Sequence, residues 1–231
     1  MRALSSLLNE GARMVGMVPL CPALTWMDGP VRNRLVRQGG PIIMMRFITD
    51  FADQGVILPV MATAGLVMAL CGWWRGAAVW TGTVSLVLAV MLLLKIAGLY
   101  YAWLAHAPII SPSGHVAAAC VVYGGLLLML GQRWFARFPA FMPVPLLGMA
   151  LAIGLTRLSL HAHTLFEVVT GGIVGCAGGI LIGRQCGPVP QPLWVYLLPC
   201  VGCIAWLFYG HHLAIEGTIR SLFAPDALLH T

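Results

Sequence analysis

Six long apolar stretches alternate with short polar connections along the chain. An α-helix needs about 20 mostly apolar residues to cross the hydrocarbon core of a bilayer, and these stretches approach that length. We expect membrane spans at residues 56–74, 77–94, 115–131, 144–160, 165–183 and 193–209. The pattern therefore predicts an all-α, polytopic transmembrane bundle with about six spans.

Composition supports this prediction and narrows the partners. The 231 residues are 60% hydrophobic and only 9% charged, and the mean hydropathy is +0.90. Soluble domains carry about 25% charged residues, so these values argue against a water-soluble fold. The formal net charge is +6, but the arginines are scattered and do not alternate with aromatic residues as on a nucleic-acid-binding face. Membrane lipids and their phosphates are the expected partners, and nucleic acid is not.

The two ends of the chain differ from its centre. Residues 1–50 are predicted to form an interfacial or re-entrant segment, residues 51–212 a membrane domain, and residues 213–231 a short tail. The apolar run at 14–27 is interrupted by Pro19 and Pro22, and no cleavage site follows it, so we do not expect a signal peptide there.

Cysteine and glycine patterns in the predicted spans indicate packing. Cys200 and Cys203 form a CxxC inside an apolar span, with no second pair to complete a metal site, and a structural role is favoured. Glycines recur every four residues in the fifth span, which places them on one face and permits close helix packing. They are Gly171, Gly175, Gly179 and Gly183.

Rare polar residues cluster when the crossings are counted. The end of span two, the start of span three, the end of span four and the start of span five all emerge on the same membrane face. The polar residues at these places are Lys95, Ser113, His115, Arg157, His163 and Glu167. Ionisable residues at membrane depth are costly, so they indicate a functional site by default.

His163 and Glu167 have the spacing of a catalytic pair. They are four residues apart, so on a helix that begins near Ala162 they share a face, and the carboxylate can accept a hydrogen bond from one ring nitrogen. The other nitrogen is then available as a nucleophile, and the carboxylate stabilises the charge that develops on the ring. His161 is two residues away, faces elsewhere, and is interpreted as an interfacial bystander.

The remaining polar residues suit a phosphate group. Arg157 can hold two phosphoryl oxygens with its planar guanidinium, and Lys95 adds a point charge. The loop 111–115 places the Ser113 hydroxyl and backbone N–H groups at a helix N-terminus, and His115 can act as a general acid and base. Fixed positive groups would stabilise the charge, so we expect neither a metal nor another cofactor.

Each of these residues also has a structural interpretation. A single Lys or Arg near an interface is usually an anchor, a single His is usually a satisfied polar residue, and Ser-Pro-Ser-Gly is usually a turn that starts a helix. Their convergence on one face favours the functional interpretation.

These residues carry a family resemblance. Pro112-Ser113-Gly114-His115, followed by Arg157, five residues, His163, three residues and Glu167, resembles the motifs of the type 2 phosphatidic acid phosphatase (PAP2) superfamily, and the similarity spans roughly residues 95–183. The resemblance implies a PAP2-like fold with His163 as nucleophile, Glu167 as its orienting carboxylate and His115 as general acid. It also implies a set of phosphate-binding groups: Lys95, Ser113, Gly114 and Arg157.

The chain departs from the family pattern in three places. Six residues after Lys95 the family has Arg-Pro, and this chain has Ala102-Trp103. His106 or an N-terminal arginine could replace the missing arginine, or the phosphate is held more weakly. Thr156 replaces the serine before the arginine, and Glu167 replaces an aspartate.

A site at headgroup level predicts a lipid phosphate as substrate. Phosphatidate, phosphatidylglycerophosphate and polyprenyl diphosphates all fit, and the sequence does not select among them. The resemblance extends to vanadium haloperoxidases, but those resemble soluble enzymes. Two alternatives stay open: a catalytically impaired lipid-binding or lipid-transport protein, and a lipid phosphotransferase. The oligomeric state is left open as well.

Loop charges predict the orientation. The face opposite the site carries arginines and no acids in its short loops, namely Arg75, Arg133, Arg137 and Arg184. Short positively charged loops stay in the cytoplasm. We therefore expect a bacterial inner (plasma) membrane protein with the catalytic face toward the periplasm or exterior, although Arg37 and Arg46 favour the reverse orientation.

Overall fold

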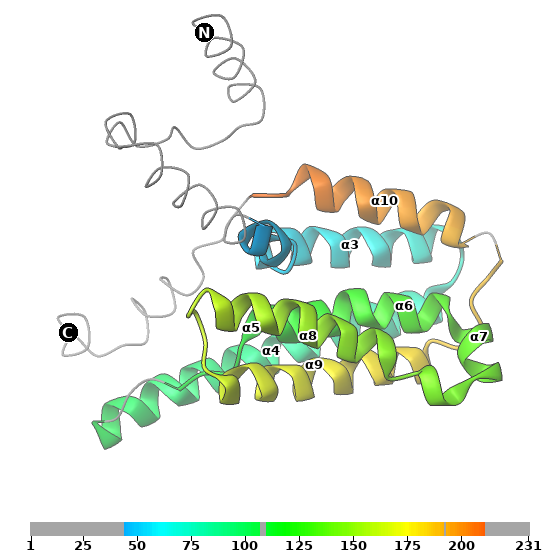
Figure 1. Ribbon diagram of the computed structural model, residues 1–231. Helices are drawn as coiled ribbons and strands as arrows, with labels where there is room; N and C mark the ends of the chain where they lie inside the picture. The colour runs from blue at the N-terminus through cyan, green and yellow to red at the C-terminus, as the bar shows by residue number, and fades with distance from the viewer. Residues whose placement is uncertain (1–43, 107–109, 192, 211–231) are drawn as a thin grey trace, which may run out of the picture. The chain divides into compact units, whose positions relative to one another are not determined.

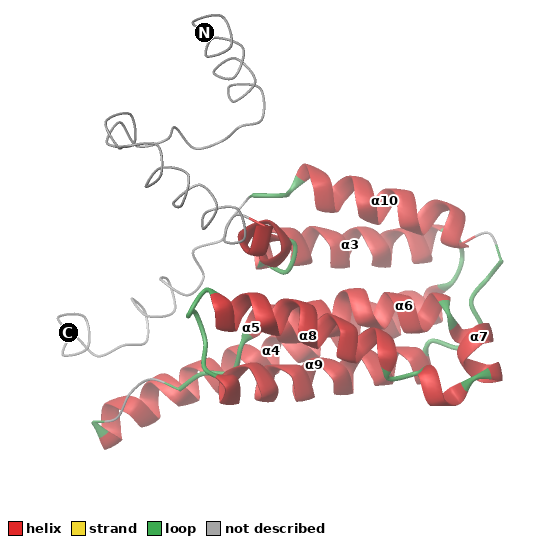
Figure 2. Cartoon of the chain, in the orientation of Figure 1, coloured by secondary structure: helices red, strands yellow, loops and turns green. Residues whose placement is uncertain are grey.

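The computed structural model describes residues 44–106, 110–191 and 193–210. All regular structure in these residues is helical: the helix Met44–Asp50 is followed by the α-helices α3 to α10, with one π-helix and one 3₁₀-helix between them (Figures 1 and 2). The all-α prediction is confirmed. The described helices form one compact unit that begins at Met44. The predicted segment boundaries stay predictions, because residues 1–43 and 211–231 lie outside the described residues.

Each of the six apolar stretches forms a helix or a nearly continuous helical segment. The bounds differ from the predicted ones by a few residues at most ends, and the α4 C-terminus is the largest difference. The segments are α3 (Gln54–Leu70), α4 (Trp74–Ala105), α5 (Gly114–Ala119) with the π-helix η2 (Cys120–Gly124) and α6 (Gly125–Leu130), α8 (Val144–Ser159), α9 (Leu165–Gln185) and α10 (Leu193–Leu207). The short α7 (Gln132–Arg137) and the 3₁₀-helix η3 (Pro139–Phe141) connect α6 to α8.

Fewer described helices are long enough to cross a membrane than the six spans that the sequence predicts. Three described helices are long and apolar enough to cross a bilayer: Trp74–Ala105, Pro139–Ser159 and Leu165–Gln185. The helix Met44–Asp50 and α3 would form a fourth crossing if the pair, bent by 41°, is one span. The segments Gly114–Leu130 and Leu193–Leu207 are apolar but shorter. Six crossings are therefore not confirmed.

Helix α9 lies at the centre of the larger helix group, where it packs against α4, α5, α6 and α8, while α3 packs against α10 and α4 (Figure 1). Close packing depends on the glycine stripe. A Cβ on Gly171 would collide with the backbone oxygen of Ser113, and one on Gly175 would collide with that of Ala117. The packing interpretation of these glycines is confirmed, and the stripe places the start of α5 directly against α9.

The outer faces of the helices are apolar. Large side chains such as Leu66, Leu151 and Ile173 are about 60% exposed. A water-soluble bundle would bury such residues, whereas a lipid-facing surface is apolar by necessity. The exposed surface and the long apolar helices together make this a membrane protein.

Helix α4 continues further than the sequence analysis predicts. It runs to Ala105, eleven residues beyond the predicted end of span two, and its end projects past the neighbouring helices (Figure 1). The family pattern has a proline at position 103, which would interrupt a helix, but Trp103 does not. Ala102 is buried at 1% exposure, and His106 caps the helix in the left-handed conformation with φ 51°.

Candidate active site

The start of α9 is fixed by a capping box. Thr164 is the N-cap: its Oγ1 accepts a hydrogen bond from the Glu167 N–H at 3.4 Å, and the Glu167 carboxylate accepts one from the Thr164 N–H at 2.9 Å. This reciprocal arrangement satisfies two backbone donors that a helix start leaves open. Glu167 is therefore held in position by the helix that carries it.

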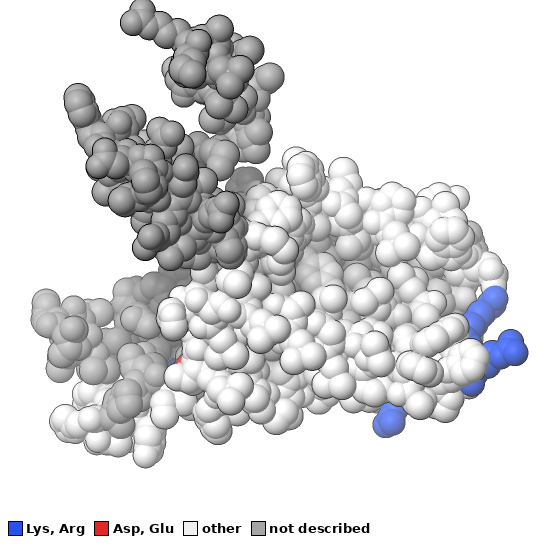
Figure 3. Space-filling model, in the orientation of Figure 1, with Lys and Arg blue, Asp and Glu red and all other residues white. Residues whose placement is uncertain are grey.

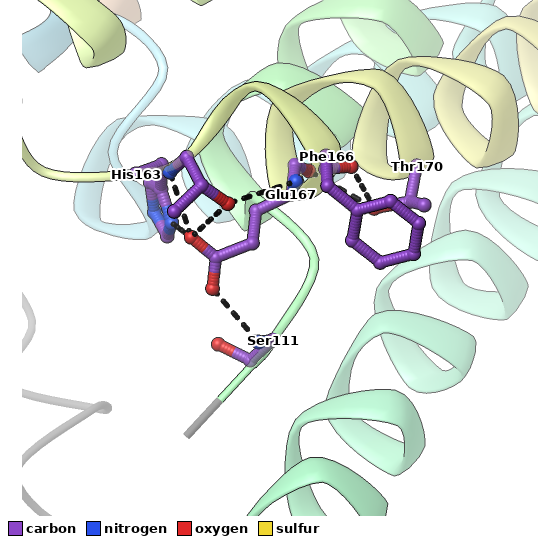
Figure 4. A network of polar contacts seen from close by, with 6 residues as sticks. Ser111, His163, Phe166, Glu167 and Thr170 are labelled. Carbon is purple, nitrogen blue, oxygen red and sulfur yellow. Dashed lines mark hydrogen bonds and ion pairs between the residues drawn. The ribbon is translucent and has the colours of Figure 1, made fainter. Parts of the chain in front are cut away.

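His163 lies beside this capping box, directly before the N-cap residue Thr164. Its Nδ1 is 3.3 Å from Oε2 of Glu167, and the two side chains are only 7% and 10% exposed (Figure 4). A carboxylate oxygen only accepts hydrogen bonds, so this contact requires a proton on Nδ1. The i, i+4 contact predicted from the sequence is therefore present in the structure.

The second oxygen of Glu167 connects α9 to the loop before α5. Oε1 accepts a hydrogen bond from the Ser111 N–H at 2.8 Å (Figure 4), and the Glu167 backbone oxygen accepts one from the Ser113 N–H at 2.8 Å. One residue thus holds both the histidine and the Pro-Ser-Gly-His loop. The longer side chain, which is a departure from the family pattern, gives the carboxylate this reach.

These contacts correct one expectation about the loop 111–115. The N–H groups of Ser111 and Ser113 donate hydrogen bonds to Glu167, so they are not available to an anion. The Ser113 hydroxyl behaves differently: Ser113 is fully buried, and its Oγ has no hydrogen-bond partner within the described residues. A buried hydroxyl without a partner is costly, so this Oγ is a donor that a bound phosphate oxygen could satisfy.

Lys95 lies close to this loop. Its Cε is 3.9 Å from the place where a Cβ on Gly114 would stand. The lysine of the first motif and the glycine of the second are therefore neighbours, although 19 positions separate them in the sequence.

Arg157 lies in the last turn of α8. Its backbone oxygen accepts a hydrogen bond from the Ala162 N–H at 3.0 Å, which fixes the short connection to α9. Its Nε atom is buried. Thr156, which stands where the family has serine, turns its hydroxyl back to the Ile153 oxygen at 2.7 Å. Arg157 therefore lies at the same end of the bundle as His163, as predicted.

His115 has a partner that the sequence analysis did not identify. Its Nε2 is 3.6 Å from Oδ2 of Asp53, the N-cap residue of α3. An acid directly before an apolar stretch is a recognisable helix-start signal, but 62 positions separate the two residues, and no local pattern connects them. His161, by contrast, is exposed. In the described part of the chain, no three or more His, Cys, Asp or Glu residues form a group that could hold a metal ion, and the predicted independence from metals stays a prediction.

The opposite end of the bundle is basic. The Arg75 Nε donates to the Gln185 backbone oxygen at 3.2 Å, which joins the start of α4 to the end of α9. Figure 3 shows basic side chains gathered at this end, near α7, which carries Arg133 and Arg137. Helix α9 has 21 residues, so about 30 Å separates this end from His163.

The fold and this site together define a helical membrane protein with a histidine–carboxylate centre. Residues 98–187 match the model of the PAP2 superfamily. The match contains the second and third motifs and begins three residues after Lys95. None of the curated proteins or solved structures compared with the chain gives a significant match. At the level of the superfamily, this match supports a phosphatase-type activity.

Proposed function

We propose that the protein is a metal-independent phosphatase of membrane lipids that works through a covalent phosphohistidine. The observation that carries this proposal is the buried contact between His163 Nδ1 and Glu167 Oε2 at 3.3 Å. It fixes the tautomer in which Nε2 is nucleophilic, and the carboxylate offsets the positive charge that the ring gains on attack.

The first step transfers the phosphoryl group to the enzyme. His163 Nε2 attacks phosphorus, the P–N bond forms, and the P–O bond to the lipid breaks. His115 donates a proton to the departing lipid oxygen. Lys95, Arg157 and the Ser113 hydroxyl stabilise the negative charge on the phosphoryl oxygens.

The second step releases phosphate and restores the enzyme. A water molecule attacks phosphorus, the P–N bond breaks, and His115 takes the proton that the water loses. Inorganic phosphate leaves, and His163 returns to the neutral form hydrogen-bonded to Glu167. His115 thus serves as the general acid in the first step and as the general base in the second.

The setting of the site favours a lipid substrate. The site residues belong to the ends of apolar helices, so a substrate with its phosphate at the interface and its tails in the bilayer fits this geometry. Phosphatidate, phosphatidylglycerophosphate and polyprenyl diphosphates share these properties. The basic end near α7 supports a bacterial inner membrane orientation with that end in the cytoplasm and the site toward the periplasm or exterior.

The test is phosphate release by detergent-purified protein from these three lipids in EDTA. Release by the parent is expected to survive EDTA, to be lost in His163→Ala, and to fall by about 10²–10⁴-fold in His115→Ala. His161→Ala is the matched control, because His161 is exposed and lies two residues from the nucleophile, and it is expected to keep the parent rate. Equal release by the parent and His163→Ala would contradict the proposal.

One observation supports a second candidate, a lipid-binding or lipid-transport protein with impaired catalysis. A buried alanine, Ala102, stands where the family pattern has a phosphate-binding arginine. Lipid binding without release of phosphate from any of the three lipids would favour this candidate. Transfer of the phosphoryl group to an added alcohol in preference to water would instead indicate a phosphotransferase.

A further inference from the structure

The carboxylate of Asp53 faces the proposed general acid from a separate helix. Its Oδ2 is 3.6 Å from His115 Nε2, a distance at which a carboxylate and an imidazolium attract each other, although it is longer than a good hydrogen bond. The side chains are 13% and 25% exposed, so water screens the attraction only in part.

The other oxygen of Asp53 holds the carboxylate in place. Oδ1 accepts a hydrogen bond from the Gly55 N–H at 2.8 Å, which makes Asp53 the N-cap of α3. The positive end of the helix dipole also favours the ionised carboxylate at this position. One oxygen is therefore committed to the helix, and the other is directed at His115.

The backbone that carries Asp53 is fastened to the helical segment that carries His115. The Tyr123 hydroxyl, in the π-helix that continues α5, donates to the Phe51 backbone oxygen at 2.7 Å. Ala52 is 1% exposed and belongs to a buried cluster with Val116. The turn before α3 thus has two attachments beside His115. A π-helix within a longer helix often occurs at a functional site.

We propose that Asp53 is the positioning residue of His115. This inference rests on the proposed function, in which His115 must be protonated before it protonates the departing lipid oxygen. Asp53 stabilises the imidazolium and holds Nε2, and Nδ1 is the nitrogen that gives the proton to the lipid oxygen and later takes one from water. Tyr123 supports this arrangement through the backbone at Phe51.

A double-mutant cycle tests this assignment. The kcat and KM of the parent, Asp53→Asn, His115→Ala and the double variant are measured with whichever lipid of the panel the parent hydrolyses fastest, with long incubations for the slow variants. Asp53→Asn is expected to lower kcat by about ten- to a hundredfold with little change in KM, since a general acid contributes about 10²–10⁴-fold in total. In the His115→Ala background the same change is expected to have no further effect.

Three additional variants separate positioning from folding. Asp53→Ser retains an N-cap oxygen but is too short to reach His115, so it is expected to melt with the parent and to lose kcat as Asp53→Asn does. Tyr123→Phe is expected to show a smaller loss of kcat that also disappears in the His115→Ala background. Asp50→Asn is the matched control, because it removes a carboxylate three residues before Asp53 that lies near Tyr209, and it is expected to keep the parent kcat.

The outcomes are distinguishable. If phosphate release depends on His163 but Asp53→Asn leaves kcat unchanged, or lowers it by the same factor with and without His115, the inference is overturned and the proposed function stands. If no release depends on His163, both are overturned.

Discussion

The two histidines of the site each face a carboxylate, but the pairs are built differently. His163 and Glu167 are one helical turn apart, both nearly buried, with a 3.3 Å contact and a capping box around the carboxylate. His115 and Asp53 come from different helices, are more exposed, and are 3.6 Å apart. A local, rigid pair suits a nucleophile whose tautomer must not change. A looser pair suits a group that must give and take a proton.

The largest loss of activity is expected when the charge of Glu167 is removed. Glu167→Gln keeps a capping-box side chain at the third helical position but no longer stabilises the charge on His163. We expect kcat to fall by at least about 10²-fold, because loss of the orienting carboxylate allows the wrong tautomer. Steady-state kinetics should show a larger loss than for Asp53→Asn. A smaller loss would contradict the ranking of the two pairs.

Shortening the Glu167 side chain tests its contact with the loop before α5. Glu167→Asp keeps the charge and follows the family pattern, but it withdraws the oxygen that bonds to the Ser111 N–H. We expect a loss of about 1.5–3 kcal/mol of stability, the usual range for a hydrogen bond to a charged group. Thermal unfolding in detergent and kcat are measured together, and an activity loss of about tenfold is expected. Unchanged stability would mean that the contact to Ser111 does not hold the loop.

A glycine substitution tests whether helix packing places the two pairs side by side. A Cβ on Gly171 would collide with the backbone of Ser113, so Gly171→Ala is expected to cost about 1–3 kcal/mol through overpacking and to reduce activity. Gly148→Ala is the control: no neighbouring atom lies within 4 Å of its Cβ position, and it should be neutral or slightly stabilising. Equal effects of the two substitutions would contradict this packing account.

The smallest expected effect comes from the helix cap itself. Thr164→Ala removes the N-cap oxygen of α9 and should cost about 1 kcal/mol of stability. Glu167 keeps its contacts with His163 and Ser111, so kcat should fall by less than about tenfold. A loss as large as that of Glu167→Gln would show that Thr164, and not Glu167, determines the orientation of the histidine.

The contrast between the pairs also explains what the sequence could predict. Spacing along one helix predicts the contact of His163 with Glu167, because i and i+4 share a face, and apolar length predicts the helical segments. The partnership of Asp53 with His115 depends on tertiary packing over 62 positions, which no local pattern encodes. The π-helix at Cys120–Gly124 was missed for a similar reason. Its one glycine, Gly124, allows the close contact with Leu146 of α8, but it does not specify the number of residues per turn.

The end of α4 could be predicted from the sequence only in part. The absence of the family's proline at Trp103 was visible in the sequence, and its structural consequence, a helix of 32 residues, follows from it. The effect on phosphate binding does not follow, because the position of the family's arginine is filled by a buried alanine. That His106 replaces the missing arginine in phosphate binding stays one of the open alternatives of the sequence analysis.

The most direct test of the central claim is to trap the phosphorylated enzyme. Purified protein is mixed with a ³²P-labelled lipid phosphate in EDTA and quenched in alkali, where phosphohistidine survives, and the parent is compared with His163→Ala and His161→Ala. We expect label on the parent and on His161→Ala and none on His163→Ala. Steady phosphate release without label on the parent, or label that persists in His163→Ala, would contradict the assignment of His163 as the nucleophile.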